Sequence, residues 1–130
     1  MGEKAILCVD DEAIIRLALI QELKKNFKDR FLYEQAPDAL IAMNTLEELS
    51  REGVRVVLII SDWLMPGING DEFLEKVHDK YPEIRAIMIT GHADGKSIER
   101  VRKNESVLAV MEKPWSSLEL VKVIENEFDE

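Results

Sequence analysis

The sequence has one cysteine and no run of more than five apolar residues. The lone Cys8 leaves no partner for an internal disulfide, which is typical of proteins in reducing compartments. The longest apolar runs, such as 56–60, are far shorter than the roughly 20 residues that a membrane-spanning helix needs. The N-terminal residues also lack the charged segment, long apolar stretch and cleavage site of a signal peptide. These absences predict a cytoplasmic protein that does not associate with membranes.

Basic residues are scarce as well, with 17 Lys and Arg against 26 Asp and Glu and a net charge of −9. An acidic chain is repelled by phosphate backbones, so we expect no direct binding to nucleic acid. The same charge suits a bound cation or a basic partner. The 130 residues, 46% of them apolar, can bury one core. We therefore expect a single domain over residues 4–128.

Two kinds of segment alternate along the chain. Short runs rich in Val, Ile and Leu are typical of strands covered on both faces of a parallel sheet, and they lie at 5–9, 31–33, 54–60, 86–89 and 107–111. Between them, apolar residues recur at the spacing of a helix with one buried face. The five predicted helices are marked by Ile15, Leu19, Leu23 and Phe27; by Leu40, Met43, Leu46 and Leu49; by Phe73, Leu74, Val77 and Tyr81; by Ile98 and Val101; and by Leu120, Val121, Ile124 and Phe128.

Five strands that alternate with five helices predict an α/β fold with helices on both faces of a parallel sheet. For five strands we expect the flavodoxin-like, doubly wound strand order 2-1-3-4-5. The ligand site of such a fold lies beyond the carboxyl ends of the strands, where the order reverses between the first and third strands. The residues that follow each strand are therefore the candidates for function.

Polar residues follow four of the predicted strands: Asp10 and Asp11, then Asp62, then Thr90, then Lys113. Three carboxylates and one lysine in a single pocket leave a charge of −2, and like charges at contact repel by about 4 kcal/mol per pair at an effective dielectric near 20. A hard divalent cation such as Mg²⁺ relieves this repulsion and prefers carboxylate and carbonyl oxygens. A carboxylate beside the metal can act as a nucleophile toward a phosphoryl group, whose charge Lys113 and Thr90 would stabilise.

Each of these residues also has a structural interpretation when it is taken alone. Asp11 could cap the first helix, and Asp62 could form the turn before Met65. Thr90 could simply favour the strand, and Lys113 could be a solvated loop residue. Their joint position at the ends of predicted strands favours the functional interpretation.

The sequence resembles the receiver domain of bacterial two-component response regulators over nearly its whole length. The resemblance is carried in order by the segments 6–12 (ILCVDDE), 61–67 (SDWLMPG) with Gly70, 88–91 (MITG) and 112–115 (EKPW). It implies that Asp62 accepts a phosphoryl group from a sensor histidine kinase or histidine phosphotransfer protein. The resemblance also implies that the protein is not an enzyme beyond its own modification, which comprises self-phosphorylation from a phosphodonor and self-dephosphorylation.

The resemblance also implies roles for the other residues. Mg²⁺ would be held by Asp10, Asp11, Asp62 and the carbonyl of Leu64, with Asp11 a more direct ligand than Asp10. Thr90 and Lys113 would contact the phosphoryl group, and the peptide bond between Lys113 and Pro114 would be cis.

The signal would leave through the fourth helix, fifth strand and fifth helix toward a downstream effector domain or protein. Many receivers carry an aromatic residue three positions before the lysine, where this sequence has Val110, so we expect Thr90 and its loop to carry most of the coupling. The chain ends just after the fifth predicted helix, and we expect either a stand-alone receiver or part of a longer protein.

Two other functions use similar residues after the strands of an α/β fold. A phosphatase of the haloacid-dehalogenase type also uses an aspartate after a strand, but it needs a second aspartate two residues later, where this sequence has Leu64. A flavodoxin-like module for a phosphate-bearing cofactor needs Ser, Thr and Gly donors after the first strand, where Asp10, Asp11 and Glu12 would repel phosphate. Both functions are weaker alternatives.

Overall fold

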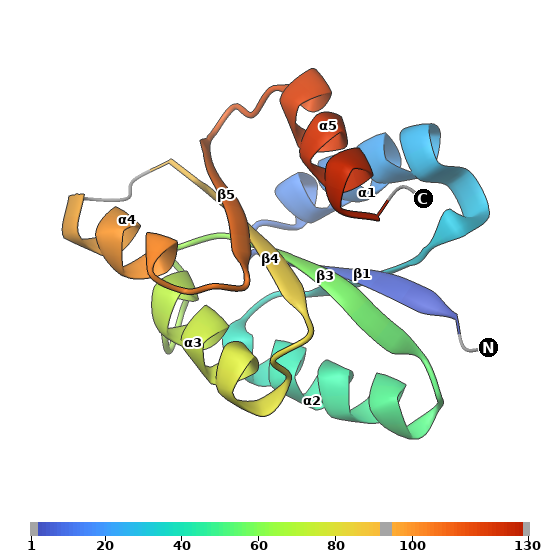
Figure 1. The fold of residues 1–130 in the computed structure, drawn as a ribbon, viewed down its shortest axis with the longest axis horizontal. Coiled ribbons are helices and arrows are strands. Elements are labelled where there is room, and N and C mark those ends of the chain that lie inside the picture. The colour runs from blue at the N-terminus through green and yellow to red at the C-terminus, as the bar shows by residue number, and fades with distance from the viewer. Residues whose placement is uncertain (1–2, 92–94, 129–130) are drawn as a thin grey trace.

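A computed structural model describes residues 3–91 and 95–128 (Figure 1). Its strands are β1 (Lys4–Val9), β2 (Leu32–Ala36), β3 (Arg55–Ser61), β4 (Arg85–Thr90) and β5 (Val107–Glu112). Its helices are α1 (Ala13–Phe27), α2 (Ala39–Arg51), α3 (Gly70–Lys80), α4 (Gly95–Arg102) and α5 (Ser117–Phe128), and a short 3₁₀ turn, Lys28–Arg30, follows α1.

The strands form one parallel sheet in the order β2-β1-β3-β4-β5, which confirms the predicted fold. Helices α1 and α5 cover one face, and α2, α3 and α4 lie on the other (Figure 1). The order reverses between β1 and β3, so the loops after these two strands diverge to opposite faces. Their divergence opens the carboxyl edge of the sheet for a ligand site.

The core consists of two apolar layers, one on each face of the central strands. Successive residues of a strand point to opposite faces, so Leu7 and Ile59 pack against α2 and α3 while Cys8 and Ile60 pack against α1 and α5. These four side chains are at most 1% exposed. Burial on both faces explains why the central strands are continuous apolar runs.

The structure corrects two details of the sequence-based prediction. The second strand spans Leu32–Ala36 rather than residues 31–33, because its five residues pair with residues Ala5 to Val9 of β1. Leu40 is 73% exposed and does not belong to the buried face of α2. That face is formed at helical spacing by Ala39, Ala42, Leu46 and Leu49, so small alanines that gave little signal in the sequence contact the sheet.

Candidate functional site

Residues at or just after the carboxyl ends of β1, β3, β4 and β5 line one open pocket at this edge of the sheet. The predicted residues Asp11, Asp62, Leu64, Thr90 and Lys113 all line it. Asp10, which the sequence also predicted, lies beside the pocket and is 2% exposed. The structure thus brings together every site residue that the sequence singled out.

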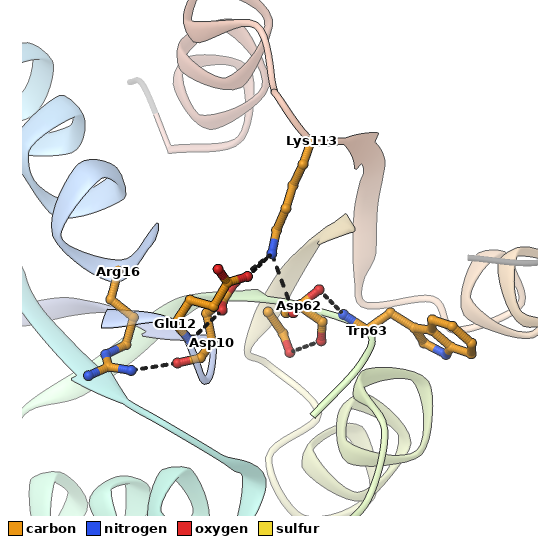
Figure 2. A network of polar contacts seen from close by, with 7 residues as sticks. Asp10, Glu12, Arg16, Asp62, Trp63 and Lys113 are labelled. Carbon is orange, nitrogen blue, oxygen red and sulfur yellow. Dashed lines mark hydrogen bonds and ion pairs between the residues drawn. The ribbon is translucent and has the colours of Figure 1, made fainter. Parts of the chain in front are cut away.

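Asp10 is held in place through all of its polar groups. Its backbone N–H donates to Ala36 O (3.2 Å), and its carbonyl accepts from Arg16 Nη1 (2.7 Å). Of its carboxylate oxygens, Oδ1 accepts from the backbone N–H of Glu12 (2.9 Å) and Oδ2 from Lys113 Nζ (2.9 Å) (Figure 2). The end of β1 is therefore a rigid part of the site.

Asp62 follows β3 directly and is 7% exposed. Its Oδ1 accepts from the backbone N–H of Trp63 (2.8 Å), and its Oδ2 lies 3.4 Å from Lys113 Nζ (Figure 2). Burial and the nearby charge of Asp10 raise the pKa of the Asp62 carboxyl group above its ordinary value, although Lys113 acts in the opposite direction. The folded protein thus bears an energetic cost for keeping this carboxylate ionised.

Lys113 is the cation of the site. Its Nζ lies 2.9 Å from Asp10, 3.4 Å from Asp62 and 3.9 Å from Glu12. Burial acts to lower the pKa of Lys113, but the hydrogen bonds and charges of Asp10 and Asp62 outweigh it and raise that pKa. The backbone N–H of Lys113 donates to Thr90 O (3.0 Å), so the ends of β4 and β5 are linked at the pocket.

The Lys113–Pro114 peptide bond is cis, as the resemblance implied.

Asp10, Asp11 and Asp62 each offer a carboxylate oxygen, and these oxygens all lie within 4.8 Å of one another. The alternative role of Asp11 as a helix cap is wrong, because the N-cap residue of α1 is Glu12, whose side chain makes no capping hydrogen bond. Asp11 is exposed, so its carboxylate is accessible to an ion from solvent. Oxygen donors of this kind fit Mg²⁺, which keeps several of its own waters.

Gly70 fixes the loop that carries Asp62. Its backbone N–H donates to Trp63 O (2.6 Å) at the start of α3. A Cβ atom at this position would lie 2.1 Å from Asp62 O and 2.9 Å from Trp63 Cα. Only glycine allows α3 to begin this close to the backbone of Asp62.

Two polar residues at the site were not predicted as part of it. Glu12 lines the pocket and brings a third carboxylate near Lys113, besides those of Asp10 and Asp62. Arg16 reaches from α1 to the carbonyl of Asp10. Glu12 directly follows Asp10 and Asp11, so its position after the first strand could have predicted its place in the pocket. The contact of Arg16 with Asp10 could not be predicted in this way, because it depends on the direction in which α1 leaves the sheet.

The strand order and the pocket at the carboxyl edge define a flavodoxin-like, doubly wound α/β protein, whose class binds ligands at the point where the strand order reverses. A sequence profile described as the response regulator receiver domain matches residues 6–125. The chain belongs to this family, the phosphorylation-dependent signalling domains of two-component systems.

Relatives with known names support the assignment. The chain is 32% identical to the hydrogenase transcriptional regulatory protein HoxA of Cupriavidus necator over 94% of its own length and 23% of HoxA. It is 33% identical to the probable transcriptional regulator ycf29 of Porphyra purpurea over 93% of its length and 54% of that protein. The chain therefore spans only part of these relatives.

Solved structures agree with the fold. A signal receiver domain from Pseudomonas fluorescens Pf-5 has a TM-score of 0.83 at 27% identity and covers 97% of this chain and 94% of its own. A CheY-like receiver domain from Methanospirillum hungatei also has a TM-score of 0.83, at 26% identity, and covers 99% and 95%. Within residues 3–91 and 95–128, none of the helices is long and apolar enough to cross a membrane.

Proposed function

We propose that Asp62 is the phosphoacceptor of this receiver domain and that Mg²⁺ assists the transfer. The observation that carries the proposal is the position of the Asp62 carboxylate between two other aspartates and Lys113. Its oxygens lie within 4.8 Å of those of Asp10 and Asp11, and Lys113 Nζ lies 3.4 Å from its Oδ2. The proposed nucleophile, the carboxylates proposed to hold the cation and the positive charge of Lys113 thus lie together at one open pocket.

In the proposed reaction, a carboxylate oxygen of Asp62 attacks the phosphorus of a phosphohistidine or of a small acyl phosphate. The new P–O bond forms as the P–N bond to the histidine, or the P–O bond to the acyl group, breaks and the leaving group keeps the electron pair. Bound Mg²⁺ would neutralise charge on the transferred oxygens, with Asp10, Asp11, Asp62 and the carbonyl of Leu64 as its protein ligands.

Lys113 would exchange its contact with Asp62 for the phosphoryl oxygens, because a charge-assisted hydrogen bond to a dianion is the stronger one. Thr90 lies at the end of β4, is 3% exposed and lines the same pocket. Its hydroxyl group would donate to another phosphoryl oxygen. The carbonyl of Thr90 already accepts from the N–H of Lys113, so both residues would respond together.

The proposed output surface is formed by α4, β5 and α5. Among the described residues α4 is the shortest α-helix, with eight residues, and its Val101 is buried in the core. Val110 on β5 is half-buried and packs in the same apolar layer. Val110 offers no aromatic ring that could rotate inward. The movement of Thr90, at the end of β4, would therefore couple phosphorylation of Asp62 to a shift of α4.

The phosphodonor would be a sensor histidine kinase or a histidine phosphotransfer protein, and a downstream effector domain or protein would read the result. Exposed apolar side chains support a protein partner on the α1 side of the molecule. Ile14 and Leu17 on α1 are 79% and 52% exposed, and Leu118 at the start of α5 is 69% exposed. Leu118 also lines a groove between α1 and α5.

The two alternative functions receive no support from the site. Leu64 is 55% exposed at the pocket and offers no acid or base for phosphatase chemistry. The loop after β1 places Asp11 and Glu12 in the pocket, where they would repel the phosphate of a cofactor.

The test is incubation with acetyl phosphate, followed by intact-mass measurement with Mg²⁺ or with a chelator. We expect one added phosphoryl group in the wild type, only with Mg²⁺, and none in Asp62→Asn. Asp71→Asn is the matched control, because Asp71 is equally buried at 8% but does not line the pocket. Persistence of the same base-labile adduct in Asp62→Asn would remove Asp62 from the role.

A further inference from the structure

Arg16 on α1 makes two side-chain hydrogen bonds that connect three elements of the fold. Its Nη1 donates to the carbonyl oxygen of Asp10 (2.7 Å), and its Nε donates to Oε1 of Gln35 near the end of β2 (2.9 Å). Figure 2 shows the guanidinium group turned toward the backbone of Asp10 rather than toward the carboxylates. Arg16 is half-buried in this position.

The Asp10 carbonyl needs such a partner because the chain leaves the sheet at this residue. The carbonyl of Val9 still accepts from the N–H of Asp62 on β3 (2.9 Å), and the N–H of Asp10 still donates to Ala36 O on β2. The next carbonyl, that of Asp10, lies beyond these strand-pairing bonds. Arg16 supplies the donor that the sheet no longer provides.

The same hydrogen bond fixes the start of Asp11. The Asp10 carbonyl belongs to the planar peptide group that joins Asp10 to Asp11, so holding its oxygen sets the orientation of the whole group. Within the part of the chain that the structure describes, no hydrogen bond or ion pair is found for the Asp11 side chain. Its backbone is therefore the means by which the fold aims this carboxylate.

We infer that Arg16 is a positioning residue for Mg²⁺: its contacts with Asp10 and Gln35 orient the Asp10–Asp11 peptide and so aim Asp11 at the ion. The inference rests on the proposed function, because it assumes that Asp11 binds the metal. Loss of a group that orients a metal ligand without touching the metal typically lowers the metal affinity by roughly 10–100-fold.

Charge alone predicts the opposite effect. Arg16 is a cation near a cation site, so by repulsion it weakens Mg²⁺ binding, and its loss would tighten it. Positioning predicts that its loss weakens binding. The sign of the change therefore separates the two effects.

The experiment titrates Mg²⁺ alone and follows the fluorescence of Trp63 in a Trp115→Phe background. Arg16→Gln removes the charge and the fork of donors, Arg16→Lys keeps the charge but loses the fork, and Gln35→Ala keeps the charge and removes one anchor of Arg16. We expect the dissociation constant to rise about tenfold in Arg16→Gln, and to rise less in Arg16→Lys and Gln35→Ala.

Arg102→Gln is the matched control, because it removes one exposed arginine from α4, and it should leave the titration close to that of the background protein. Thermal unfolding with a chelator shows that each variant is folded. Tighter or unchanged Mg²⁺ binding in Arg16→Gln would overturn the inference. If Arg16→Gln does not fold, unchanged Mg²⁺ binding in both Arg16→Lys and Gln35→Ala would overturn it. A background protein that gives the same titration as its Asp11→Asn variant would instead contradict the proposed metal site.

Discussion

Replacement of Gly70 by alanine should disturb the fold and the site together. The added Cβ would lie 2.1 Å from Asp62 O, 2.9 Å from Trp63 Cα and 3.0 Å from the carbonyl carbon of Asp62. Ordinary contacts between such atoms are near 3.5 Å, so α3 and the Asp62 backbone must separate by more than about 1 Å. All three neighbouring atoms are backbone atoms, and none can yield by a change of rotamer.

The expected cost follows from this overlap. Overpacking typically costs about 1–3 kcal/mol, and a clash between backbone segments belongs at the upper end. The short bond from Gly70 N–H to Trp63 O (2.6 Å) would be strained as well. A loss of about 3 kcal/mol lowers the unfolding temperature of a chain of this size by about 12 °C.

Thermal unfolding followed by circular dichroism measures this loss, and Mg²⁺-dependent labelling by acetyl phosphate measures the effect on Asp62. Gly95→Ala is the matched control, because among the described residues, apart from its chain neighbours and the backbone of its own helix, no atom lies within 4 Å of a Cβ at Gly95. Its expected effect is zero or a small stabilisation, below about 1 kcal/mol. Unfolding of Gly70→Ala at the wild-type temperature, with normal labelling of Asp62, would refute the steric argument.

Three further predictions concern a pH dependence, a thiol and the signal. Burial and Asp10 raise the pKa of Asp62 in the folded protein above its ordinary value of 3.8, so the protonated Asp62 stabilises the fold below pH 3.8 and this stability is lost as the pH rises through the folded-state pKa. At pH 7 and in chelator, Asp62→Asn should therefore unfold at a higher temperature than the wild type. An equal or lower unfolding temperature would contradict the direction of the pKa shift. Burial raises the pKa of Cys8 to about 12, so the native thiol should not react with a thiol reagent until the protein unfolds, and rapid native labelling would show that the β1 core opens. Thr90→Ala should confine the amide shifts caused by a phosphoryl mimic to the pocket while Val110→Ala leaves their spread intact, and the reverse result would disprove the proposed route.

The arrangement of the sheet could be predicted because its signals are strong and local. The central strands are buried on both faces, so each is a continuous apolar run. Parallel strands have their carboxyl ends at one edge of the sheet. The strand order alone therefore predicted that Asp10, Asp62 and Lys113 lie close together, as the structure shows.

The features that were not predicted depend on contacts between distant segments. The exposure of Leu40 reflects which side of α2 meets the sheet. Leu46 and Leu49 continue the spacing of Leu40 as well as that of Ala39 and Ala42, and only the packing against the sheet selects the alanines. The edge strand β2 includes Glu34 and Gln35 because it pairs with β1, not because they are apolar. The role of Arg16 requires the direction of α1 relative to the Asp10 carbonyl, which no periodicity contains.

Chemical mapping of the modified residue shows directly whether Asp62 carries the phosphoryl group. Protein treated with acetyl phosphate and Mg²⁺ is reduced with borohydride, which converts an acyl phosphate to an alcohol and marks the carboxyl group that carried it. Peptide mass spectrometry then locates the mark, with the chelator-treated protein as control. We expect one Mg²⁺-dependent mark, at Asp62. A mark at Asp10 or Asp11 with Asp62 unmodified would show that another carboxylate accepts the phosphoryl group.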